Sequence, residues 1–98
     1  MEWTYILGGF ALLKQNIKIK NPTGLHLRPA GKLCREAMKF KSNITFEHRG
    51  NITNAKSVLS VLGAGIKSGN ELTFICEGED ETEAMSHLIA FIESGLGE

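Results

Sequence analysis

The chain has 98 residues, of which 42% are hydrophobic, with 11 Lys or Arg and 11 Asp or Glu. This length supports one compact domain with a single core, and zero net charge excludes a polyanion-binding or acidic-tail protein. No stretch has the roughly 18 to 20 apolar residues of a membrane span, and the apolar segment 1–13 carries Glu2 where a signal peptide is basic, so we expect a cytoplasmic protein without membrane insertion.

The first half of the chain predicts a strand, a helix and a hairpin. Ile17 and Ile19 alternate with polar residues over 16–20, the period of a half-buried strand, and the sequence NPTG at 21–24 is typical of a turn. Apolar residues then recur at helical spacing over 28–38, with Pro29 in the first turn, where its missing N–H is harmless. Alternation over 43–49, followed by Gly50 and Asn51, indicates a hairpin.

The second half predicts two helices separated by a strand. Ser57 is placed to cap a helix of about two turns, with Val58, Leu59 and Leu62 on one side and Gly63 and Gly65 at its end. Alternation over 71–77 indicates a strand, and Asp80 with Glu83 forms an Asp variant of a capping box before a long apolar helical stripe. The order over 14–98 is β-α-β-β-α-β-α. It predicts an α+β two-layer open-faced sandwich, a four-stranded antiparallel sheet with three helices on one face.

Charge is unevenly distributed between the two halves. Residues 14–49 carry nine Lys or Arg against two acidic residues, whereas residues 71–98 carry eight acidic residues and no Lys or Arg. Opposite fields of this kind suit steering toward a charged partner.

The cysteines and two of the histidines show no metal-binding pattern. Cys34 and Cys76 have neither CxxC nor Cys/His ligand spacing, so we expect buried free thiols. His48 and His87 lie in strand and helix patterns and are expected to be structural or surface residues. We therefore expect no metal and no cofactor.

His26 and Arg28 stand at the mouth of the first helix, in GLHLRPAGKL (24–33). The unpaired N–H groups and partial positive charge of a helix N-terminus attract anions. A ring nitrogen that attacks a phosphoryl group there would leave a dianion beside amides and a guanidinium, and histidine is a recognised covalent catalyst. A histidine near an N-cap is more often merely solvated or capping, so this pattern alone leaves both interpretations open.

The segments TGLHLRPAGKL (23–33) and NAKSVLSVLGAGIKSGNELTF (54–74), in this element order, resemble the HPr family, the histidine-containing phosphocarriers of the bacterial phosphoenolpyruvate:sugar phosphotransferase system. The resemblance covers about residues 14–96. It implies that His26 takes a phosphoryl group on Nδ1 from Enzyme I, that Arg28 stabilises the group, and that Thr23 and Gly24 shape the turn. EIIA domains would accept the group next, so the protein would be a relay and not an enzyme with its own turnover.

The resemblance also implies a regulatory residue and a partner-binding surface. Ser57 stands where many Gram-positive relatives are phosphorylated by an HPr kinase/phosphorylase, with a catabolite-control transcription regulator as a further partner. Serine is also a favoured N-cap for stability alone, so both roles stay open. The partner-binding candidates are Leu27, Val58, Leu59, Leu62, Lys32 and Arg35. The apolar residues of the second helix are equally explained as core.

Two alternative functions remain to be weighed. The first is a mainly regulatory HPr-like protein acting through phospho-Ser57 in carbon catabolite control, and the presence of His26 argues against an exclusively regulatory role. The second is a small nucleic-acid-binding domain using the basic region 14–49. Zero net charge and the absence of a GxxG or aromatic strand motif argue against nucleic acid as a partner.

The sequence departs from the family pattern in two places. Leu27 stands where relatives usually carry a small residue, which bears on the choice of partner. Residues 1–13 precede the expected phosphocarrier domain at 14–98, and they are an artefact of the start site, a mobile tail or an added packing element. Their apolar residues favour packing within or between chains, and these are Ile6, Leu7, Phe10, Leu12 and Leu13.

Overall fold

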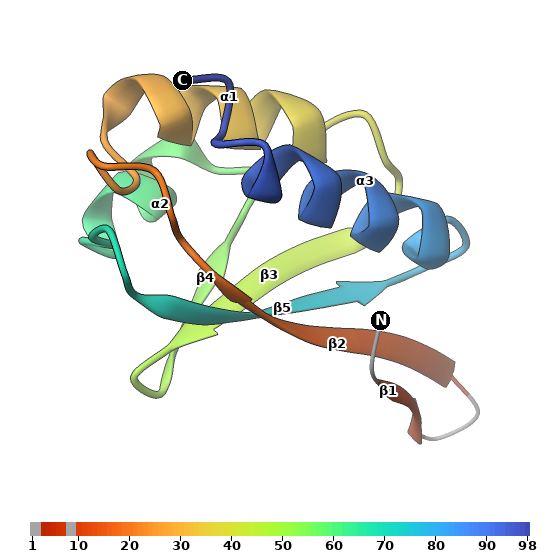
Figure 1. Cartoon of the computed structure of the whole chain (residues 1–98). Coiled ribbons are helices and arrows are strands. Elements are labelled where there is room, and N and C mark those ends of the chain that lie inside the picture. The colour runs from red at the N-terminus through yellow and green to blue at the C-terminus, as the bar shows by residue number, and fades with distance from the viewer. Residues whose placement is uncertain (1–2, 8–9) are drawn as a thin grey trace.

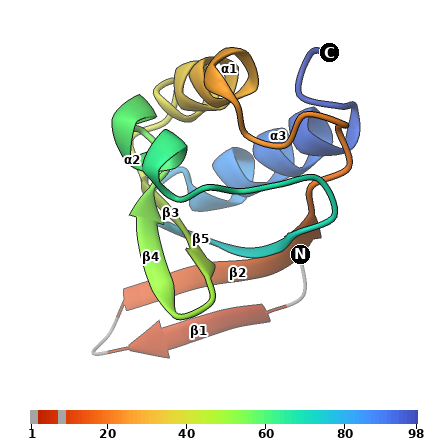
Figure 2. The same cartoon turned by 90° about the vertical axis from the view of Figure 1, so that its left-hand side faces the viewer.

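One antiparallel sheet and three helices form two layers in the computed structural model, which describes residues 3–7 and 10–98. The elements are β1 (Trp3–Leu7), β2 (Phe10–Lys18), α1 (Leu27–Ala37), β3 (Asn43–His48), β4 (Asn51–Asn54), α2 (Val58–Gly63), β5 (Glu71–Glu77) and α3 (Glu81–Glu93). The strand order is β1-β2-β5-β3-β4, with antiparallel neighbours throughout. All three helices cover the same face of the sheet (Figures 1 and 2). The predicted α+β open-faced sandwich is confirmed.

Four of the strands are those that the sequence predicts, and β1 adds a fifth at the sheet edge. β1 pairs with β2, with Trp3 opposite Lys14 and Leu7 opposite Phe10. The predicted strand at 16–20 therefore starts earlier than expected, and the expected domain boundary at residue 14 lies inside β2. Leu12 and Leu13 are both buried, which hides the period-2 alternation in this stretch. The structure does not describe the side chains of residues 1–11. The expected packing of Ile6, Leu7 and Phe10 therefore lies outside the described part of the chain.

The core lies between the sheet and the helices. Phe46 of β3 and Phe74 of β5 are fully buried, with ring centroids 5.3 Å apart, at the centre of this layer. Leu72 and Cys76 share the buried face of β5 with Phe74, in agreement with the alternation predicted over 71–77. Complete burial of one such side chain contributes roughly 1.5–3 kcal/mol. Apolar and polar side chains alternate along the strands, so the apolar ones gather on one face of the sheet. The helices cover that face because its side chains are stabilised by burial.

The short helix α2 buries a different residue from those expected. Val61 is fully buried, whereas the side chain of Leu59 is 79% exposed. Val58 and Leu62 are only partly buried against the core. Successive residues are about 100° apart around a helix, so position 59 lies nearly opposite Val61, the residue that faces the core. The prediction that Val58, Leu59 and Leu62 lie together was wrong for Leu59.

The predicted capping box at the start of α3 does not form. Asp80 is the N-cap, but its side chain makes no cap hydrogen bond. Its carboxylate instead accepts hydrogen bonds from the backbone N–H groups of Lys41 and Ser42, at 2.8 and 2.9 Å, and from the Ser42 hydroxyl. Asp80 therefore fastens the loop that follows α1 to the start of α3.

Both cysteine thiols are buried, and the helices are short. Cys34 and Cys76 are free and buried, as predicted, and burial raises the pKa of Cys76 to about 12. Within residues 3–7 and 10–98, no helix combines the length and hydrophobicity needed to span a membrane.

Candidate functional site

His26 is the N-cap residue of α1, and its side chain is exposed. Its backbone is extended (φ −71°, ψ −178°), and the ring makes no capping hydrogen bond. Its carbonyl oxygen accepts the N–H of Ala30 at 2.8 Å, which closes the first helical turn. As predicted, Pro29 lies in this turn, where it is buried. The helix is therefore built by the backbone of His26, and the imidazole projects from it into solvent.

The turn before His26 is fastened to the rest of the fold by its backbone. Gly24 has a φ of +65°, and a Cβ there would come within 2.6 Å of the Ile66 carbonyl oxygen. The next residue, Leu25, donates its N–H to the same oxygen at 3.0 Å and is buried. Gly24 is thus required both by its positive φ and by a close backbone contact. His26 follows directly from this fixed point.

Asn21 and Glu98 complete the turn, and sequence reasoning assigned neither to the site. The buried Asn21 donates through Nδ2 to the Gly24 carbonyl at 2.7 Å and to Glu98 Oε1 at 2.8 Å. The hydroxyl of Thr23 donates to the same Glu98 oxygen at 2.7 Å. Asn in an NPTG turn was a usable signal, whereas nothing in sequence connects residue 98 with residue 23.

Two cations, Lys32 and Arg28, also act on the Glu98 carboxylate. Hydrogen bonds from Asn21 and Thr23, with smaller contributions from the charges of Lys32 and Arg28, lower the pKa of the Glu98 carboxyl. Lys32 also donates to the Gly97 carbonyl at 2.9 Å, which places the chain end against α1 (Figure 1). The exposed Arg35 lies in the last turn of α1, away from the end that carries His26.

The start of α1 can accept an anion. Pro29 has no N–H and the N–H of Ala30 is bonded, so the unpaired amides in the described helix end are those of Leu27 and Arg28. The Arg28 guanidinium is exposed and follows His26 by two residues. Two unpaired amides and the positive end of the helix dipole thus lie at the end of α1 that carries His26, and Arg28 adds a cation two residues further on. These are the groups that can stabilise a phosphoryl dianion.

Ser57 is the N-cap of α2, as predicted. Its side-chain oxygen accepts the N–H of Ser60 at 3.3 Å, and the residue is half-buried. This bond accounts for serine at position 57 through stability alone. The hydroxyl is nonetheless at the surface, beside the exposed Leu59 and Ser60.

Two exposed leucines mark the surface formed by α1 and α2, which contact each other in the structure (Figure 2). Leu27 follows His26 and is 68% exposed, and Leu59 follows Ser57 by two residues and is 79% exposed. Leucine side chains with so much exposed apolar area are candidates for contact with another protein. Of the predicted partner-binding residues, Val58 and Leu62 contribute less, because they pack partly on the core.

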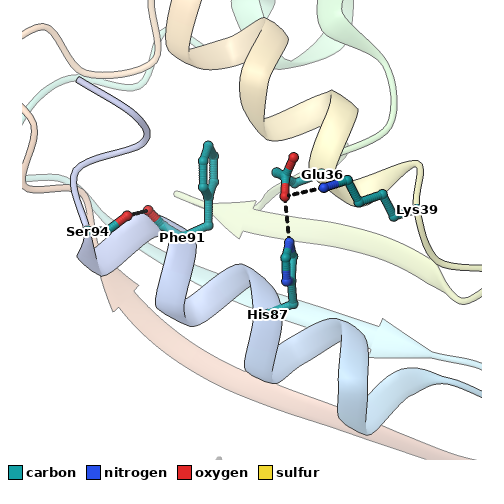
Figure 3. Close-up of polar contacts among 5 residues, drawn as sticks. All are labelled: Glu36, Lys39, His87, Phe91 and Ser94. Atoms are coloured by element: carbon teal, nitrogen blue, oxygen red, sulfur yellow. Dashed lines mark hydrogen bonds and ion pairs between the residues drawn. The ribbon is translucent and has the colours of Figure 1, made fainter.

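The other histidines are not brought to this site. His87 on α3 contacts Glu36 on α1 (Figure 3), and His48 lies at the end of β3. In the described part of the chain, no three His, Cys, Asp or Glu side chains are grouped as a metal site.

The comparisons with known proteins agree with this geometry. A family model described as "PTS HPr component phosphorylation site" matches residues 13–94. The HPr-like protein Crh of Halalkalibacterium halodurans is 44% identical over 82 residues, which cover 84% of this chain and 98% of that protein. The phosphocarrier protein HPr of Buchnera aphidicola is 40% identical over 77 residues, 79% of this chain and 91% of that protein.

A solved structure shares the fold at similar identity. The crystal structure of HPr-C-His from Thermoanaerobacter tengcongensis superposes with a TM-score of 0.85 at 42% identity, and the match covers 88% of this chain and 97% of that one. The family match begins inside β2, so β1 lies outside it.

Proposed function

The chain belongs to the HPr family of phosphocarriers, and from this premise we propose that His26 accepts a phosphoryl group from Enzyme I and passes it to EIIA domains. The observation that carries the proposal is the exposed imidazole of His26 at the N-cap of α1, whose first two amides, those of Leu27 and Arg28, are unpaired. The protein then acts in the cytoplasm as a relay with no metal or cofactor of its own.

The transfer requires only groups that this chain supplies. Nδ1 of neutral His26 attacks phosphorus, a P–N bond forms, and the bond from phosphorus to the donor breaks, so that its electron pair leaves with the donor. The amides of Leu27 and Arg28 and the Arg28 guanidinium stabilise the charge on the phosphoryl oxygens. In the second step the acceptor attacks the same phosphorus, and His26 leaves as the neutral ring.

The direct test is incubation with phosphoenolpyruvate and Enzyme I. The wild-type protein should gain one acid-labile phosphate, His26→Ala should gain none, and His48→Ala should behave as wild type. Label that persists in His26→Ala, or an unmodified wild-type protein, would overturn the assignment.

Exposed side chains of α1 and α2 support a docking surface next to His26. Leu27 and Leu59 supply apolar area, and Arg28 supplies positive charge for an acidic partner surface. Lys32 adds positive charge to the docking surface, and its ammonium group is held at the Gly97 carbonyl. Val58 and Leu62 pack partly on the core and mainly hold α2 in place.

Regulation through Ser57 is the second part of the proposal, and its support is the N-cap position. A phosphate at an N-cap is favoured by the helix dipole, so the fold would persist while a dianion appears beside Leu59. An HPr kinase/phosphorylase with ATP should label wild type but not Ser57→Ala. Labelled protein should then bind a catabolite-control regulator and take phosphate from Enzyme I more slowly. Absence of label removes this branch, including the mainly regulatory alternative.

The proposed phosphocarrier domain is residues 14–98, and residues 1–13 are an added element whose described part includes β1. The pairing of β1 with β2 supports a role at the sheet edge. A chain that starts at residue 14 should accept phosphate on His26 at the wild-type rate, and a large loss of rate would show that the extension belongs to the domain.

A further inference from the structure

A cavity of about 600 Å³ lies away from His26, between the β3–β4 hairpin, the end of α2 and the turn that leads into β5. Its size falls in the range of small-molecule sites, roughly 300 to 1,000 Å³. Residues of β4 and α2 both line it, and these two elements contact each other; their places in the fold are seen in Figure 2. Its walls include neither His26 nor the turn at 21–24, although the backbone of Lys67, one of the wall residues, lies against Gly24 of that turn. The cavity therefore has walls of its own and borders the His26 turn on one side.

Two asparagines present hydrogen-bond donors at this cavity. Asn54 Oδ1 accepts the N–H of Lys56 at 2.9 Å, and Asn70 Oδ1 accepts the N–H of Lys67 at 2.8 Å. These bonds fix which end of each amide is oxygen. The NH₂ groups of both side chains therefore remain available as donors. Both residues line this cavity, and Asn54 also borders a second hollow beside β3 and β5.

The charged groups that line the cavity are all basic. Arg49 and Lys67 are exposed cations without an ion-pair partner in the described structure, and His48 lies beside them. None of the described lining residues carries a carboxylate. A cavity with cations, amide donors and no acid selects an anion.

The backbone at Arg49 gives a second, independent indication. Arg49 has a φ of +52° and precedes Gly50 with a φ of +81° in the hairpin turn. Asn or Gly is the relaxed residue at the first of these positions, whereas a long side chain is strained there. A strained backbone conformation at Arg49 points to a functional requirement for the arginine side chain, because a smaller residue would relax the turn.

The C-terminal end of α2 opposes an anion less than an open helix end would, although a helix C-terminus is ordinarily its negative pole. The carbonyl groups of Ser60 and Val61 accept the N–H of Ala64, and that of Leu62 accepts the N–H of Gly65. These three carbonyls are therefore occupied within the cap, which weakens the negative field that α2 presents to the cavity.

From these observations we propose that the cavity binds a small phosphorylated polyol, a sugar phosphate in class, with its phosphate on Arg49 and Lys67 and its hydroxyl groups on the asparagine amides. The described walls contain no Phe, Tyr or Trp on which a nucleobase could stack. The chemistry therefore favours a hydroxylated phosphate over a nucleotide.

Backbone-amide NMR with ribose 5-phosphate as the probe tests the site. Saturable shifts should concentrate at residues 49–54 and 63–70, with ribose and adenosine monophosphate as weaker competitors. Inorganic phosphate should bind more weakly because it lacks the hydroxyl groups. Equal binding of inorganic phosphate would overturn the polyol part, and shifts centred on residues 26–28, or none at millimolar concentration, would overturn the site.

Three variants separate binding from folding. Arg49→Asn should relax the turn and leave or raise the unfolding free energy, while it weakens binding by roughly tenfold, the effect of one charged hydrogen bond. Lys67→Gln should weaken binding similarly, and Lys41→Gln, at an exposed lysine outside the cavity paired with Glu79 at 3.2 Å, should leave it unchanged. Gly63→Glu adds a carboxylate where a Cβ meets open space, and should abolish binding. Unchanged affinity in both the Arg49 and Lys67 variants contradicts the proposal.

Discussion

His87 of α3 contacts Glu36 of α1 through Nε2 and Oε1, 2.5 Å apart, which joins two helices 51 residues apart in sequence (Figure 3). Lys39 donates to the same Glu36 oxygen at 2.9 Å. These two hydrogen bonds lower the pKa of Glu36, and the bond with His87 has the larger effect. Because Glu36 is ionised at neutral pH, Nε2 must carry the hydrogen and donate it. The imidazole also contacts Phe40, with ring centroids 5.4 Å apart.

Replacement of His87 by Ala is expected to destabilise the fold by about 1 kcal/mol, because a partly exposed charge-assisted hydrogen bond and a ring contact are lost together. Urea unfolding measures the change. Glu36→Gln in the His87→Ala background should add little, since the two residues share one interaction. Fully additive losses would show that the helices are joined by something else.

Gly24 and Gly31 form a matched pair of glycines, seven residues apart in sequence. Gly24→Ala should lower the unfolding free energy by roughly 1–3 kcal/mol, because its φ is positive and the new Cβ meets the Ile66 carbonyl at 2.6 Å. Gly31→Ala should instead raise it by up to about 1 kcal/mol, because Gly31 is in α1 with nothing within 4 Å of its Cβ. In the proposed function only Gly24→Ala should also slow phosphorylation of His26. A neutral Gly24→Ala would contradict the fixed turn.

Local patterns predicted most of this fold because they depend on near neighbours. Alternation over β5, the apolar stripe of α3, Pro29 in the first turn of α1 and Ser57 as an N-cap are each set by residues a few positions apart. Leu59 was misplaced because a six-residue helix is too short for periodicity to distinguish its faces.

The long-range contacts could not be predicted from one sequence. Asp80 has the identity of a capping residue, yet its carboxylate is taken by Lys41 and Ser42. Glu98 joins the turn at 21–24 from the far end of the chain. In both cases the partners are brought together only by the tertiary fold. For Asp80 the local signal gave the right N-cap position and the wrong hydrogen-bond partners, and for Glu98 there was no local signal.

The carboxylate of Asp80 should make stability depend on acid pH. Hydrogen bonds from the Ser42 hydroxyl and the Lys41 amide lower its pKa from 3.8 to about 2. Because the pKa of Asp80 is lower in the folded protein than in the unfolded chain, its ionised carboxylate stabilises the fold fully at pH values above the unfolded pKa. This stabilisation is lost as the pH falls through the folded pKa. Asp80→Ala should therefore reduce the urea midpoint at neutral pH, and the difference from wild type should shrink as pH approaches 2.

Glu79→Ala is the control for Asp80, since the Glu79 side chain is 71% exposed and its carboxylate pairs with the exposed Lys41 at 3.2 Å. Its urea midpoint should match wild type within error at all these pH values. A pH-independent loss in Asp80→Ala would mean that the residue acts through its shape and not through its charge.

Glu98→Gln should favour the phosphorylated state of the proposed carrier. Glutamine keeps an oxygen that can accept from Asn21 and Thr23 but removes a negative charge from the field of Arg28 and Lys32. A phosphoryl dianion on His26 then meets less repulsion, so its equilibrium fraction against a fixed donor should rise by roughly twofold. The rise should fade at high salt. An equal rise in Glu93→Gln, an exposed acid on α3, would show a general effect of net charge.

Leu59→Ala and Val61→Ala separate docking from folding on α2. Val61 is fully buried, so its truncation should destabilise the fold by roughly 1–3 kcal/mol. Leu59 is 79% exposed, so its truncation should change stability by less than about 0.5 kcal/mol. In the proposed function Leu59→Ala should nevertheless raise the KM for Enzyme I or an EIIA domain, because it removes apolar area from the docking surface. Wild-type KM values for both partners in Leu59→Ala would remove α2 from that surface and leave Leu27 and Arg28 beside His26 as its remaining support.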